Sequence, residues 1–74
     1  MKYYYEYKYK NGRKVGGHNL ERIEFCDYFI KLIGKDEIPT NYDYEIRYWE
    51  ALIDMRNIEY LKITPMLEKE KKDE

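Results

Sequence analysis

Hydrophobic and polar positions alternate with a period of two at the start of the chain. From residue 3 to residue 9 every odd-numbered position is a tyrosine, and the even-numbered positions hold polar residues and one further tyrosine, Tyr4. A period of two with aromatic residues predicts a strand over residues 2–10. Its inner face would consist of Tyr3, Tyr5, Tyr7 and Tyr9.

A turn signal follows this strand immediately. Asn11-Gly12 is the typical pair for a two-residue type I′ turn, which requires positive φ at both positions. Such a loop fixes the register of the hairpin. We therefore expect Lys10 opposite Arg13 and Lys8 opposite Val15, with the second strand ending or bending at Gly16-Gly17.

The next segment shows helical spacing. Asn19 suits a helix N-cap and Gly34 a helix terminator, so the pattern predicts a helix over residues 19–34. Its apolar arc is wide, and its polar strip holds only Glu24, Asp27 and Lys31. A wide arc is typical of a central helix buried on more than one side. The apolar residues are Ile23, Phe25, Cys26, Phe29, Ile30, Leu32 and Ile33.

A second helix is predicted over residues 40–56. Thr40 with Asp43 three residues later resembles a capping box, and "YWEALIDMR" contains helix formers. The apolar residues form two stripes: Tyr44, Tyr48, Ala51, Leu52 and Met55, then Tyr42, Ile46, Trp49 and Ile53. A strand is the alternative, because the apolar residues Tyr42, Tyr44, Ile46 and Tyr48 also alternate with charged residues along the chain.

Residues 58–63 read as a short strand closed by Thr64-Pro65, and residues 66–74 as a charged tail, either a frayed helix or disordered. The predicted fold is therefore α+β in the order ββααβ. A three-stranded antiparallel sheet would pack on two helices, in one small domain over residues 1–65.

Charge is unevenly distributed, although the net charge of the 74 residues is −1. Residues 1–17 carry five basic side chains and one acidic one, whereas residues 35–64 carry seven acidic and four basic. The single cysteine, the lack of a leader and the short apolar runs indicate a cytoplasmic protein that is not in a membrane. The abundance of Lys, Tyr and Ile is typical of an AT-rich gene, such as that of a phage or mobile element.

Catalytic and metal-binding motifs are missing from the sequence. It has no serine, one cysteine and one histidine, too few for a nucleophile with its base or for a metal-ligand cluster. Cys26 is expected to be buried in the first helix, and His18 to lie in a surface turn. We therefore expect a protein that is not an enzyme and uses no metal or cofactor.

Two groups of residues are candidates for binding. The apolar stripe around Trp49 exceeds what so small a domain can cover, and an acidic strip lies beside it. These predicted protein-binding residues are Tyr42, Asp43, Ile46, Trp49, Glu50, Ile53 and Asp54. The leading hypothesis is a small protein-binding module, an inhibitor that blocks a nucleic-acid-binding host protein or defence nuclease. A homodimer through the Trp49 stripe is compatible with it.

The alternative hypothesis uses the N-terminal hairpin. Basic side chains beside aromatic rings are typical of surfaces that hold single-stranded nucleic acid. The predicted residues are Tyr4, Lys8, Lys10 and Arg13 on the outer face, with Lys14 at the tip.

Overall fold

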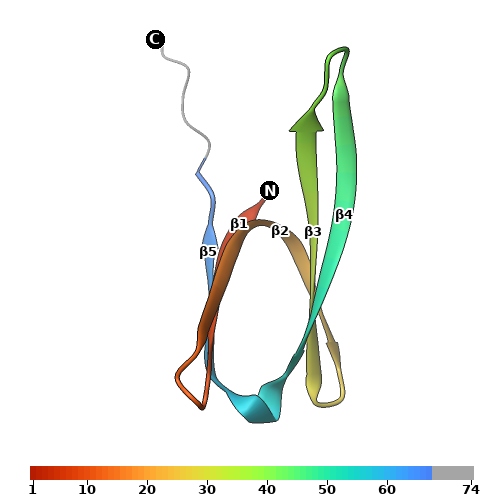
Figure 1. Ribbon diagram of the computed structural model, residues 1–74. Coiled ribbons are helices and arrows are strands. Elements are labelled where there is room, and N and C mark those ends of the chain that lie inside the picture. Colours follow the sequence, from red (N-terminus) through yellow and green to blue (C-terminus); the bar gives the residue numbers. More distant parts are fainter. Residues whose placement is uncertain (68–74) are drawn as a thin grey trace.

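Five antiparallel strands form a single sheet in the computed structural model, which describes residues 1–67 (Figure 1). The spatial order of the strands is β4-β3-β2-β1-β5. A 3₁₀ turn, η1 (Met55–Asn57), connects the fourth strand to the fifth. The strands are β1 (Tyr3–Tyr9), β2 (Lys14–Cys26), β3 (Phe29–Pro39), β4 (Tyr44–Asp54) and β5 (Ile58–Pro65).

The long strand β2 joins the two halves of the sheet. Its first half pairs with β1 and its second half with β3. Both ladders shift register near the middle of β2, on either side of Leu20. Asn19, in the bend, has a φ of 65°. Bulges of this kind bend a strand and increase its twist. Figure 1 shows the result, in which β2 arches from the β1–β5 side to the β3–β4 side.

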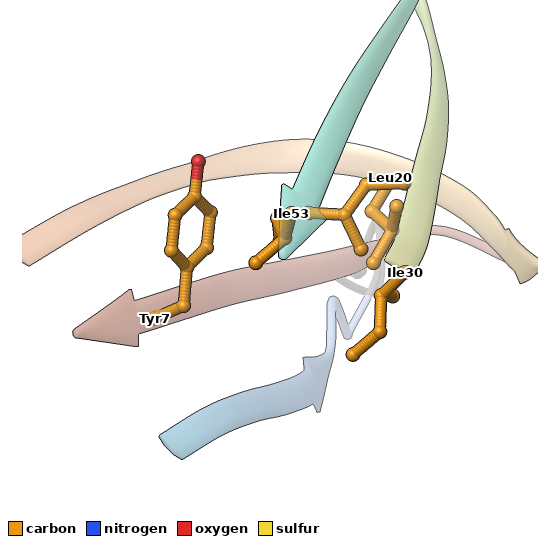
Figure 2. Packing of buried hydrophobic residues seen from close by; sticks show 5 residues of the cluster. Tyr7, Leu20, Ile30 and Ile53 are labelled. Carbon is orange, nitrogen blue, oxygen red and sulfur yellow. The ribbon is translucent and has the colours of Figure 1, made fainter. Parts of the chain in front are cut away.

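The core lies where the bend brings the two halves together. Five hydrophobic side chains are buried there: Tyr7, Leu20, Ile30, Leu32 and Ile53. Figure 2 shows Leu20, Ile30 and Ile53 gathered together, with the ring of Tyr7 rising from β1 beside them. So few buried residues make a core that supplies only a few kcal/mol.

Two glycines make room for aromatic rings beside this core. A Cβ at Gly17 would lie 2.7 Å from the Tyr5 ring, and one at Gly34 would overlap the indole of Trp49. The rings of Tyr5 and Trp49 then lie 5.6 Å apart, between centroids. These glycines let β1 and β4, which are not neighbours in the sheet, pack against each other through their rings.

Asp54 fixes the connection between β4 and β5. Its carboxylate accepts hydrogen bonds from the Arg56 backbone N–H and Nε, both 3.0 Å, and from Arg56 Nη2 at 2.8 Å. These bonds hold the pKa of Asp54 below its usual value. The Arg56 guanidinium also lies 4.6 Å from the ring centre of Tyr28, which joins η1 to the β2–β3 turn.

The N-terminal hairpin is confirmed, but its predicted register is wrong by one residue. Lys8 lies opposite Lys14, and Tyr7 opposite Val15. The loop contains three residues, because Tyr9 N–H donates to Arg13 O and Gly12 N–H to Tyr9 O. Gly12 has a φ of 98°, as in a turn that ends with a bulge. The strand continues through Gly16-Gly17.

The predicted α+β fold is wrong: residues 1–67 contain five strands and no α-helix. Residues 19–34 form most of β2 and the first half of β3. The turn between them is Asp27-Tyr28, with positive φ at Asp27. Apolar residues lie on both faces of these strands, and this produced the wide arc that resembled a helix. Cys26 is exposed beside the turn, contrary to the prediction.

The second predicted helix is also wrong, and the alternative reading as a strand is correct. Residues 44–54 form β4. Thr40 Oγ1 does accept from the Asp43 N–H at 3.0 Å, as a helix cap would. The Thr40 N–H also donates to Asp43 O at 2.7 Å, which closes a turn instead. The same hydrogen bond serves both structures, so the capping signal could not distinguish them.

The strand predicted over residues 58–63 is confirmed as part of β5. Most of the charged tail predicted for residues 66–74 lies outside the described residues. Within residues 1–67, no helix has the length and apolar character needed to cross a membrane.

Candidate protein-binding site

The outer half of the β3–β4 hairpin projects from the sheet. The ladder between β3 and β4 runs without a register shift from Phe29–Asp54 to Pro39–Tyr44, whereas the ladder between β2 and β3 stops at Gly34. Residues 35–48, which we call the arm, therefore form a two-stranded ribbon. Figure 1 shows the arm, in green, standing clear of β2.

Three polar contacts hold the base of the arm. Lys2 Nζ donates to the Lys35 carbonyl at 3.3 Å, and the Lys35 ammonium lies 3.7 Å from Glu21. Asn19 Nδ2 donates to Asp36 Oδ1 at 2.9 Å. These contacts end at Asp36, so the arm beyond it depends on its own two strands and on the Thr40 turn.

One face of β4 carries large hydrophobic side chains that are exposed to solvent. Tyr44 is 64% exposed, Ile46 49%, Tyr48 72% and Leu52 62%, and Tyr42 in the turn is 98% exposed. Adjacent strand residues point to opposite faces, so the even-numbered residues of β4 share one face. We call Tyr44, Ile46, Tyr48 and Leu52 the aromatic face, and Tyr42 lies beyond its end in the turn. Exposed apolar groups gathered in this way mark interaction sites.

The arm is also acidic. Its residues 35–48 carry four acidic and two basic side chains, whereas residues 1–34 carry four acidic and seven basic ones. Arg47 Nε lies 3.1 Å from Glu45 on the same strand, which leaves the other carboxylates of the arm in excess. In the fold, the acidic residues are therefore concentrated in the arm, which also carries exposed tyrosines, and the basic N-terminal segment lies in the body.

The structure divides the predicted protein-binding residues among three places. Trp49 and Ile53 point inward, where Trp49 packs on Gly34 and Ile53 is buried. Ile46, Glu50 and Asp54 lie on the opposite face of the strand. Tyr42 and Asp43 lie in the turn at the arm's tip.

This division follows from strand geometry, because residues that share a face of a helix alternate between the two faces of a strand. Trp49 packs against the core, so the residues of the predicted Trp49 stripe do not form one exposed surface.

Sequence reasoning missed Tyr44, Tyr48 and Leu52 as surface residues. It placed them in the stripe expected to cover the core, yet all three are exposed. The alternation from Tyr42 to Tyr48 was the signal that could have identified them. A strand of this kind presents every second residue to solvent when only one face is packed.

The predicted nucleic-acid-binding residues lie partly together. Tyr4 and Lys8 share the outer face of β1, and the observed register places Lys14 directly opposite Lys8. Lys10 and Arg13 lie in and beside the loop. Tyr60 and Lys62 of β5, which the sequence did not indicate, complete this basic face.

Two carboxylates interrupt the basic face. Glu59 lies 3.6 Å from the Lys8 ammonium, and Glu6 accepts a hydrogen bond from the Tyr60 hydroxyl. That hydrogen bond lowers the pKa of Glu6 and raises the pKa of Tyr60. The face is therefore a mixed surface in which much of the positive charge is compensated.

A shallow pocket of about 270 Å³ lies between the body and the arm's base. It is lined by Tyr5, Gly17, His18, Asp36 and Trp49. His18 is exposed there, in β2 and not in a turn as predicted. No group of three or more potential metal ligands occurs among residues 1–67.

No protein-family model, curated protein or solved structure matches this chain.

Proposed function

We propose that this protein is a small protein-binding module that engages its partner through the aromatic face of the β3–β4 arm. The observation that carries the proposal is the row of exposed side chains Tyr44, Ile46 and Tyr48 on an arm that projects from the body. Tyrosine is among the residues that dominate the binding energy of protein interfaces.

The acidic character of the arm indicates the kind of partner. An arm with four acidic and two basic side chains is attracted to a positively charged partner, and such attraction accelerates association. A protein with a basic groove, such as a nucleic-acid-binding host protein or nuclease, fits this description. Occupying that groove would make the module an inhibitor, in keeping with a phage or mobile-element origin.

The test is affinity capture with matched variants. We expect the protein to retain a partner that the double variant Tyr44→Ser/Tyr48→Ser fails to retain, with binding by the purified partner weakened by about tenfold or more. Tyr4→Ser is the control, because Tyr4 is an exposed tyrosine on a different face. Equal retention by the wild type and the double variant, or no partner at all, would contradict the proposal.

A nucleic-acid-binding function is the second candidate, favoured by the side-by-side placement of Lys8 and Lys14 with Tyr60 and Lys62 near them. Titration of labelled single- and double-stranded DNA and RNA at two salt concentrations tests it. Binding that weakens steeply with salt and is lost in Lys8→Glu/Lys14→Glu, but not in Lys31→Glu, would support this function. No binding at low salt eliminates it.

A further inference from the structure

The open edge of β4 lacks three features that often prevent strands from pairing, namely proline, lysine and a bulge, although it carries Glu45 and Arg47. In the described part of the chain, β4 pairs only with β3, so its other edge presents unpaired backbone groups. Edge strands are commonly protected by proline, lysine or a bulge. Residues 44–54 include no proline and no lysine, and the β3–β4 ladder has no register shift.

The edge at the other side of the sheet is different. β5 contains Lys62 and ends at Pro65, and its ladder with β1 shifts register between Lys8 and Tyr9. The two edges of one sheet therefore differ in their protection. Only β4 has the long, regular edge on which another strand adds easily.

We propose that the β4 edges of two copies of this protein pair antiparallel, around a two-fold axis at Ile46. Opposed residues of an antiparallel ladder lie on the same face, whereas neighbouring residues of one strand lie on opposite faces. A residue at the two-fold axis must therefore be paired with the same residue of the other copy. An axis at Glu45 would place two glutamates opposite each other, and one at Arg47 two arginines. The axis at Ile46 instead places Glu45 of each copy opposite Arg47 of the other.

The same register matches the remaining residues of the arm. Tyr44 of each copy faces Tyr48 of the other, an aromatic cross-strand pair, and the two Ile46 side chains meet at the axis. Glu45 and Arg47 already form an exposed pair within one strand, at 3.1 Å. Exchanging these two pairs, one in each copy, for two pairs between the copies costs little, since exposed pairs contribute little by themselves.

Pairing also completes the arm. A two-stranded ribbon is marginally stable in water, whereas two joined arms form a four-stranded segment. The aromatic faces of the copies become one continuous surface, because a two-fold axis perpendicular to a sheet keeps equivalent faces on the same side. This inference rests on the proposed function in that both use β4. The dimer forms through the backbone edge, with Tyr44, Ile46 and Tyr48 beside the seam, and the partner contacts the exposed sides of the same residues.

Sedimentation over a range of protein concentrations tests the dimer. We expect a species of twice the 9.3 kDa monomer mass to grow with concentration. Glu45→Arg and Arg47→Glu should each raise the dissociation constant by about tenfold or more, since each places like charges opposite each other twice. Glu37→Arg is the control: Glu37 lies on β3, away from the open edge, and its substitution changes the charge as much as Glu45→Arg does.

Mixing the two single variants decides between this register and a general charge effect. Glu45→Arg and Arg47→Glu should associate with each other as tightly as the wild type associates with itself. The double variant Glu45→Arg/Arg47→Glu should again self-associate. Circular dichroism checks that each variant is folded.

A wild type that stays monomeric, or single variants that dimerise as well as the wild type, would overturn the dimer. If the wild type is monomeric and binds a partner that Tyr44→Ser/Tyr48→Ser does not bind, the dimer is overturned and the proposed function is kept. A dimer that binds no other protein would overturn only the proposed function.

Discussion

The body of the sheet and the arm are built from the same two strands but are stabilised in different ways. In the body, β3 lies between β2 and β4, and Leu32 is completely buried. In the arm, β3 pairs with β4 alone, and the side chains of Tyr44, Ile46 and Tyr48 are exposed. Hydrophobic residues on one strand therefore have two roles, which depend on the face and the half of the strand that they occupy.

The largest expected effect is the difference in stability between alanine substitutions of a buried and an exposed leucine. Leu32→Ala should lower the free energy of unfolding by about 2–5 kcal/mol, because it removes buried methyl groups and leaves a cavity. In a core this small, that loss would unfold much of the protein. Leu52→Ala, at a side chain 62% exposed, should change the free energy by no more than about 0.5 kcal/mol. Urea denaturation of both variants measures the difference, and similar losses would contradict it.

The next largest effect is expected at the junction of body and arm. A Cβ at Gly34 would overlap the indole of Trp49, so Gly34→Ala should destabilise the fold by about 1–3 kcal/mol. Gly16→Ala is the milder comparison, since the nearest atom to a Cβ there is the Tyr5 carbonyl oxygen, at 3.2 Å. Thermal unfolding followed by Trp49 fluorescence measures both. A Gly34→Ala variant as stable as the wild type would show that the ring does not pack on Gly34.

The smallest effect is a dependence of stability on pH. The pKa values of Asp54 and Glu6 are lowered by hydrogen bonds from Arg56 and Tyr60 respectively. The unfolded chain therefore binds more protons in acid, so this stabilisation is present above the usual carboxyl pKa and is lost as pH falls through the lowered values. Stability should decline from about pH 5 downward.

Substitution of one carboxylate tests the origin of that decline. Asp54→Asn should reduce the slope of stability against pH below about pH 5, because one group with a lowered pKa is removed. Glu37→Gln is the control, an exposed carboxylate on the arm. Denaturant midpoints measured at several pH values give the slopes, and identical slopes for wild type and Asp54→Asn would exclude this contribution.

The sequence predicted the parts of the fold in which local signals agree. Tyrosine alternation with Asn11-Gly12 correctly indicated the first hairpin and the inward face of its tyrosines. It could not give the register, because the same two residues also suit a three-residue loop with Gly12 at positive φ. Residues 58–63 were also correctly predicted as a strand, because the segment is short, its apolar residues alternate and a proline closes it.

The rest could not be predicted, because the apolar pattern depends on contacts made elsewhere in the chain. Phe29 and Ile33 are half-buried on one face of β3 while Ile30 and Leu32 are buried on the other, which erases the period of two. The Asp27-Tyr28 turn contains neither glycine nor proline. In β4, the exposed Leu52 hides the alternation of the inward residues Trp49, Ala51 and Ile53.

The candidate site suffered most from this error. The residues around Trp49 were chosen as one helical stripe, and the strand placed Trp49 and Ile53 in the body and Ile46 on the open face. The acidic excess of residues 35–64 was nevertheless visible in the sequence. The strand geometry was needed to show that part of this segment projects as the arm and which of its residues face solvent.

Amide hydrogen exchange along the β3–β4 hairpin measures whether the arm is a free ribbon that is available for binding. In dilute protein without a partner, amides of residues 37–47 should exchange much faster than those of residues 30–33 and 51–53, because only the body is held by a third strand and a core. Their protection should rise when the protein is concentrated or its partner is added. Equal protection of arm and body in dilute protein would contradict the account.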